Sequence, residues 1–139
     1  MDILLAGAAY VLQYALRVLG IGKFHNKRIV FFSFFGKQYS CNPKYLCEYL
    51  MQHYPEYEIV WAFDNPQRFS WLEERNVRLV RYNSLAFVRT CLTSRYVITN
   101  SQVPSWLPVL RRQTLINTWH GGGAYKRVGT GFLRPRMGK

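Results

Sequence analysis

The chain has 139 residues, a formal net charge of +12 at neutral pH and a sequence pI near 10.0. This length fits one domain, and a content of 49% hydrophobic and 17% aromatic residues excludes a disordered basic tail. Three cysteines without a C-x-x-C spacing exclude a disulfide-rich scaffold and argue against a zinc site. The charge indicates an anionic partner: nucleic acid, an anionic membrane or a phosphate-bearing substrate. A solvated basic face is the simpler alternative.

The amino-terminal residues 3–16 form an apolar run that predicts a helix. Such a helix is about 21 Å long, shorter than the roughly 30 Å hydrocarbon core, so a clean membrane span is not expected. We expect residues 1–22 to form an apolar amphipathic helix that associates with an anionic membrane, and residues 23–27 to form a linker. The alternative is a helix that packs onto the domain or onto a partner.

Residues 28–139 read as one Rossmann-like domain, because strand-like and helix-like segments alternate along them. Asn42 is the expected N-cap of the first helix and Ser84 that of the last. This alternation predicts a parallel α/β sheet covered by helices on both faces. Ligands of such sheets bind in the loops after the strands. The expected strands span 28–34, 58–63, 77–80, 95–99 and 114–119, and the expected helices begin near 42, 66 and 84.

The loop after the first strand carries Gly36 and Lys37 but does not match a phosphate-binding P-loop. The first glycine of G-x-x-x-x-G-K-[ST] is missing, and Gln38 stands where the hydroxyl residue belongs. A dinucleotide fingerprint is also missing after this strand. With these two motifs excluded, the loop is interpreted as a binding loop that carries a lysine at the expected ligand edge. The alternative interpretation is an ordinary βα turn without a binding role.

The most specific motif is His120 followed by Gly121, Gly122 and Gly123, with Lys126 and Arg127 shortly after. A histidine at the end of a buried strand is a candidate general base toward a hydroxyl. The glycines let backbone N–H groups approach an anion, and the two basic residues add positive charge. A structural histidine before a simple turn is the alternative.

Other interpretations of these features are weaker. The oxyanion loop of a lipase-like hydrolase needs a G-x-S-x-G elbow, and the sequence has none. Nucleic-acid binding is disfavoured because most aromatic residues lie in expected core positions and no RRM or helix-turn-helix signature is present. His25 and His53 lack metal-like spacing and are interpreted as surface histidines, so no metal is expected.

Four stretches together resemble the CDP-glycerol glycerophosphotransferase family of teichoic-acid and capsular-polymer synthesis. They are residues 32–45, 57–61, 94–100 and 117–126, and the resemblance covers roughly residues 28–130. Many members carry His-Gly-Thr-Pro where this chain has Gly122 and Gly123. The resemblance implies a glycosyltransferase-B-like enzyme on the cytoplasmic face of the bacterial plasma membrane, attached peripherally.

In that family the hydroxyl end of a lipid-linked polymer attacks the β-phosphorus of CDP-glycerol, or of a related CDP-polyol, and CMP leaves. The resemblance assigns catalysis to His120 and implies no cofactor. It implies substrate contacts at Ser33, Lys37, Tyr39, Asn100, Gly121, Gly122, Gly123, Lys126 and Arg127.

The chain is short for this family, whose carboxyl-terminal domain supplies most of the nucleotide site. We therefore expect residues 28–139 to be a truncated acceptor-side domain, the amino-terminal half of the fold, with no turnover unless a separate carboxyl-terminal domain completes it. The alternative function is a non-catalytic, membrane-associated module that binds an anionic polymer or lipid.

Overall fold

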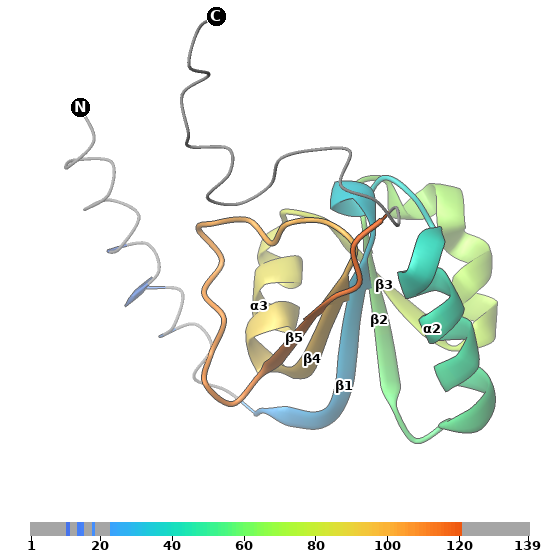
Figure 1. Ribbon diagram of the computed structural model, residues 1–139, viewed down its shortest axis with the longest axis horizontal. Coiled ribbons are helices and arrows are strands. Elements are labelled where there is room, and N and C mark those ends of the chain that lie inside the picture. The colour runs from blue at the N-terminus through green and yellow to red at the C-terminus, as the bar shows by residue number, and fades with distance from the viewer. Residues whose placement is uncertain (1–10, 12–13, 16–17, 19–22, 121–139) are drawn as a thin grey trace, which may run out of the picture.

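The structure is a computed structural model, and it describes residues 11, 14–15, 18 and 23–120. Most of the helix expected at residues 1–22 lies outside the described residues, although positions 11, 14, 15 and 18 are helical. The described part of the chain is a single sheet with helices on both of its faces (Figure 1).

Five parallel strands form the sheet: β1 (His25–Phe32), β2 (Glu58–Phe63), β3 (Val77–Arg81), β4 (Ser94–Thr99) and β5 (Thr114–Asn117). Their order is β3-β2-β1-β4-β5, so the buried strand β1 lies in the middle. Val30 pairs with Val60 of β2 on one side and with Val97 of β4 on the other. The Rossmann-like parallel α/β fold predicted from the sequence is confirmed.

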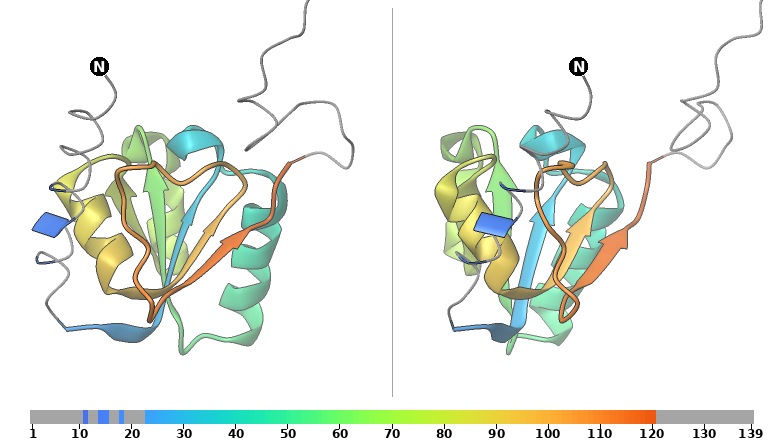
Figure 2. Two further views of the ribbon diagram at one scale, coloured as in Figure 1. Left: turned by 60° about the vertical axis from the view of Figure 1, so that its left-hand side comes forward. Right: turned by 90° about the vertical axis from the view of Figure 1, so that its left-hand side faces the viewer.

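The helices divide between the two faces of this sheet (Figures 1 and 2). One face carries α2 (Cys41–His53) and the 3-10 segment η2 (Pro66–Arg75), and the other carries α3 (Leu85–Thr93). A short 3-10 turn, η1 (Phe34–Gly36), follows β1 directly. The segment between β4 and β5 also packs on the α3 face, where Leu107 is buried.

Alternate residues of β1, β2, β3 and β4 enter the two separate cores, whereas β5 is largely exposed. Val30 and Phe32 of β1 face α3, while Ile29 and Phe31 face α2 and η2. Because both faces are covered there, residues 29–32 of β1 and 59–63 of β2 are continuous apolar runs, as expected for a parallel sheet. Phe31 stacks on Trp61 with ring centroids 5.3 Å apart, which ties β1 to β2 on the α2 face.

Four details differ from the sequence predictions. The N-cap of α2 is Ser40, because the Asn42 side chain instead donates to the Thr118 carbonyl at 3.3 Å. The expected helix at 66–75 is a 3-10 segment with a kink at Phe69.

The expected linker 23–27 is partly strand, since His25 already pairs with Ser94 of β4. The last strand ends at Asn117, and its residues are largely exposed rather than buried.

The predicted N-cap of α3, Ser84, is confirmed, and we expect it to contribute measurably to the free energy of unfolding. The Ser84 hydroxyl accepts from the Phe87 N–H at 3.2 Å and donates to the Arg81 carbonyl at 2.6 Å. We expect Ser84→Ala to lower the free energy of unfolding by about 1 kcal/mol, measured by urea denaturation. Ser40→Ala is the matched control, since Ser40 makes no side-chain cap bond, and an equal loss in both variants would contradict this role.

Candidate active site

The carboxyl ends of β1 and β4 form the topological switch point of the sheet. After β1 the chain crosses the α2 face to reach β2, whereas after β4 it runs over the α3 face to reach β5. Neighbouring loops that leave in opposite directions open a crevice, and ligands of open α/β sheets bind in such crevices. The residues that follow β1, β4 and β5 therefore lie at the expected ligand-binding edge.

Asn100 ties the loop after β4 to the loop after β1. Its Oδ1 accepts from the Phe34 N–H at 2.9 Å, and Ser101 Oγ accepts from the Phe35 N–H at 3.4 Å. Asn100 is fully buried, and its Nδ2 has no hydrogen-bond partner among the described residues. Asn100 therefore holds the backbone at the switch point and keeps one buried donor free beside it.

The end of β5 is joined to the same place. The Thr118 N–H donates to the Thr99 carbonyl at 2.8 Å, and Asn117 Nδ2 donates to the Ser101 carbonyl at 3.2 Å. Trp119 follows with a φ of 54°, and its N–H donates to Asn117 Oδ1 at 2.9 Å. This turn brings the His120 imidazole beside the Phe34 ring, with centroids 5.0 Å apart.

The loop after β1 is held in an uncommon backbone conformation. Phe34 and Phe35 have φ values of 46° and 57°, a region that side chains other than glycine seldom occupy. Ser33 is buried and its hydroxyl donates to the Gln38 carbonyl at 2.5 Å, which closes the loop. Backbone strain of this kind concentrates at functional sites, where the surrounding structure fixes it. Here it fixes the ring against which His120 lies.

The other predicted contact residues lie in different surroundings. Lys37 is exposed on the loop after β1. The Tyr39 ring packs edge-on against Trp61 and Trp71, with centroids 4.6 and 5.4 Å away. Burial, with smaller contributions from Cys47 and Glu48, raises the pKa of Tyr39. Gly121, Gly122, Gly123, Lys126 and Arg127 lie outside the described residues.

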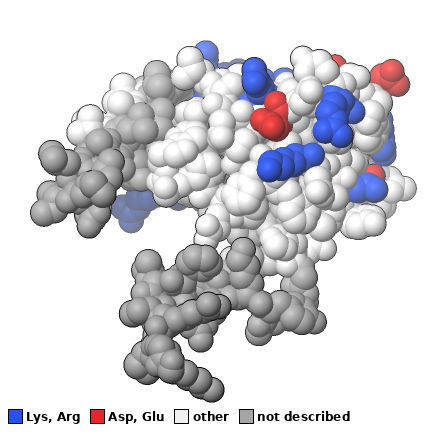
Figure 3. Space-filling model, turned by 90° about the horizontal axis from the view of Figure 1, so that it is seen from above, with Lys and Arg blue, Asp and Glu red and all other residues white. Residues whose placement is uncertain are grey.

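Viewed onto the end of the sheet where the strands finish, uncharged described residues make up much of this face (Figure 3). His120 itself is exposed, and it follows an edge strand rather than the buried strand expected from the sequence. An exposed imidazole is chemically able to accept a proton from a hydroxyl within hydrogen-bond distance. Among residues 23–120 and the few described before them, no cluster of His, Cys, Asp or Glu could hold a metal ion.

Phe34, Asn117 and Thr118 contribute to this edge and were not identified from the sequence. Phe34 supports the His120 ring, and the other two fix the turn that presents it. A signal was available for Asn117, because it is an asparagine at the end of β5. Amides at the carboxyl ends of parallel strands lie at the ligand-binding edge.

The fold and this edge define the class: a Rossmann-like α/β domain whose site follows the carboxyl ends of its strands. The chain belongs to the CDP-Glycerol:Poly(glycerophosphate) glycerophosphotransferase family, whose profile matches residues 13–138. The resemblance inferred from four stretches of sequence is thereby confirmed.

Named relatives of this chain are teichoic acid enzymes. A teichoic acid poly(glycerol phosphate) polymerase of Bacillus spizizenii is 33% identical over 113 residues, which are 80% of this chain and 28% of the relative. A solved structure of the wall teichoic acid polymerase TagF has a TM-score of 0.68 and 29% identity, covering 85% of this chain and 28% of that one. A TagF histidine-to-asparagine variant with CDPG gives a TM-score of 0.66, 28% identity and coverage of 84% and 30%. The chain thus spans less than a third of the length of these relatives.

Proposed function

We propose that this chain is the acceptor-side part of a transferase that moves glycerol phosphate from CDP-glycerol to the hydroxyl end of a teichoic-acid-like polymer. The observation that carries the proposal is the exposed His120 imidazole, held at the switch point by Phe34 and by the Asn100 and Asn117 contacts. Family membership and a TagF structure soaked with CDPG support the choice of donor.

In the proposed reaction the terminal hydroxyl of the acceptor attacks the β-phosphorus of CDP-glycerol, and His120 accepts the hydroxyl proton. The new O–P bond extends the polymer by one glycerol phosphate, and the bond between the two phosphates breaks to release CMP. Backbone N–H groups of Gly121 to Gly123, with Lys126 and Arg127, are proposed to offset the phosphate charge. The unpaired Nδ2 of Asn100 is a further donor at this edge.

The test measures CMP release by this chain joined to the carboxyl-terminal part of the Bacillus spizizenii relative, beyond the matched segment. We expect CMP release from CDP-glycerol that requires added poly(glycerol phosphate) acceptor, and none from the 139-residue chain alone. Release at the same rate without acceptor would contradict a transferase, and full turnover by the chain alone would contradict the acceptor-side assignment.

We also propose that the chain associates peripherally with the cytoplasmic face of the plasma membrane, where a lipid-linked acceptor is extended. Val11, Tyr14 and Val18 support this, because they are spaced as one helix face and are 71%, 72% and 51% exposed. No helix among the described residues is long and apolar enough to cross a bilayer.

Sedimentation with vesicles containing phosphatidylglycerol tests this membrane association. We expect the chain to sediment at low salt, and the double variant Tyr14→Asp with Val18→Asp to lose most of the bound fraction, because charge on the apolar face opposes insertion. Val109→Asp is the matched control, since Val109 is also an exposed valine but lies in the segment between β4 and β5. Failure of the unaltered chain to sediment would contradict this proposal.

A further inference from the structure

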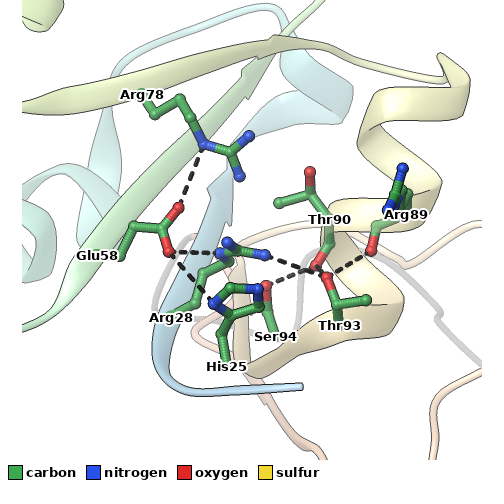
Figure 4. Close-up of polar contacts among 8 residues, drawn as sticks. All are labelled: His25, Arg28, Glu58, Arg78, Arg89, Thr90, Thr93 and Ser94. Atoms are coloured by element: carbon green, nitrogen blue, oxygen red, sulfur yellow. Dashed lines mark hydrogen bonds and ion pairs between the residues drawn. The ribbon is translucent and has the colours of Figure 1, made fainter. Parts of the chain in front are cut away.

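A basic cavity lies at the opposite edge of the sheet from His120, where the strands begin. Its volume is about 640 Å³, within the usual range of small-molecule sites. Its walls come from the start of β1, from β3 and from α3 (Figure 4). The lining includes the basic side chains of Lys23, His25, Arg28, Arg78 and Arg89, together with the hydroxyl-bearing residues Thr90 and Thr93.

One carboxylate among the described residues pairs with these basic side chains. Glu58 accepts from Arg28 Nε at 2.7 Å, and its oxygens lie 3.4 Å from Arg78 Nε and 3.9 Å from His25 Nδ1. Four permanent cations line the cavity, and Glu58 pairs with two of them, Arg28 and Arg78, so the cavity carries an excess of positive charge. Like charges held together in a partly buried site repel unless an anion joins them.

Arg28 is the most enclosed of these cations, with 12% of its side chain exposed. Its Nε donates to Glu58 and its Nη1 donates to Thr93 Oγ1 at 3.1 Å. These contacts use two of the five guanidinium N–H donors. Arg28 is therefore fixed in position by its neighbours while other donors of the same group stay available toward the cavity.

The charge excess acts on neighbouring titratable groups. Burial, and then Arg28, Lys23 and Arg78, lower the pKa of His25, against the opposing effect of Glu58. Burial and Arg28 also lower the pKa of Arg78, again against Glu58. Burial is the largest cause of both shifts, and the smaller effect of the neighbouring cations agrees with the excess of positive charge in the cavity lining.

We propose that this cavity is a phosphate-binding site, separate from the site at the carboxyl edge. Guanidinium groups match the geometry of a phosphate group, and a ring of Arg and Lys with few carboxylates is how proteins bind one. The same phosphate chemistry is available from a soluble glycerol phosphate unit and from the headgroup of an anionic lipid.

The proposal does not depend on the transferase activity, and the 139-residue chain tests it directly. NMR titration at low salt follows the imidazole signals of His25 with sn-glycerol 3-phosphate in one arm and phosphatidylglycerol vesicles in the other. We expect saturable binding that raises the pKa of His25, because a bound anion offsets the cations around it. Binding in the first arm assigns a soluble or polymer source. Binding confined to the second arm assigns a lipid headgroup only where the His25 pKa also rises in the double variant Tyr14→Asp with Val18→Asp, which lacks the apolar helix face expected to hold the vesicles.

Variants separate this cavity from general charge attraction. Arg89→Gln is expected to weaken binding about tenfold, in line with loss of one charge-assisted contact. Arg81→Gln is the matched control, because Arg81 is an exposed arginine at the carboxyl end of β3 and lies outside the cavity lining. Glu58→Gln is expected to tighten binding, since it removes the competing carboxylate.

Absence of binding in both arms would overturn the proposal. Equal weakening by Arg89→Gln and Arg81→Gln would do the same, because it would show attraction to net charge only. Arg78→Gln serves as a second cavity variant if Arg89→Gln does not fold.

Discussion

Replacing His120 by alanine is expected to lower the rate of CMP release about 10²–10⁴-fold in the joined enzyme, the range that general-base catalysis supplies. The loss should appear in kcat, because the proton is transferred during the chemical step and not on binding. The measurement compares kcat and KM for CDP-glycerol in the wild-type and His120→Ala enzymes under saturating acceptor.

His53→Ala is the matched control for that variant. His53 is the last residue of α2, and its exposed ring lies against the Tyr49 ring. It therefore lies away from the switch point, which follows the ends of β1 and β4. Its removal should leave kcat unchanged. If His120→Ala retained wild-type kcat, or if both variants fell equally, His120 would have no role as the base.

Gly36→Ala is expected to lower the free energy of unfolding by about 2–5 kcal/mol. Gly36 has a φ of 83°, where a non-glycine residue costs about 1–2 kcal/mol. A Cβ there would also lie 2.8 Å from the Cβ of the buried Tyr82, and overpacking of this kind costs about 1–3 kcal/mol. Urea denaturation of the 139-residue chain measures the sum.

Asn83→Ala separates the two causes of the Gly36 effect. Asn83 has a φ of 59° in an exposed turn, so this variant adds backbone strain without a contact in the core. A loss of about 1 kcal/mol is expected there. A Gly36→Ala chain as stable as wild type would show that the loop after β1 can shift, and the support of His120 by Phe34 would then be in doubt.

The strands were predictable because their chemistry is local. Residues 28–34 and 58–63 are β-branched and aromatic runs, and such runs fit a strand with both faces covered. Ser84 was predictable for the same reason, since a cap and its helix are adjacent in sequence. For α2 the local signal was ambiguous, because Ser40 and Asn42 are both good caps and Pro43 is accepted anywhere in the first turn.

The parts that were missed depend on which strands become neighbours. The order β3-β2-β1-β4-β5 places Asn100 beside Phe34, 66 residues earlier in the chain, and no local pattern encodes that contact. The basic cavity is a similar case. The sequence analysis singled out Lys126 and Arg127 as the basic residues of the site, whereas the cavity gathers Arg28, Arg78 and Arg89 from three separate elements.

His25 shows most clearly that local sequence patterns do not reveal contacts made by strand pairing. In the sequence it stands in a polar stretch and is interpreted as a surface histidine of a linker. In the structure it begins β1 and lines the cavity near Glu58. Strand pairing with Ser94 extends β1 backwards into residues whose own composition does not predict a strand.

The most direct test of the central claim is rescue of the His120→Ala joined enzyme by added imidazole, with transfer followed as radiolabelled glycerol incorporated into polymer. If the His120 imidazole at the switch point takes the proton of the acceptor hydroxyl, free imidazole should restore incorporation in proportion to its concentration. It should leave the wild-type rate unchanged. Wild-type incorporation by His120→Ala without imidazole would contradict the assignment.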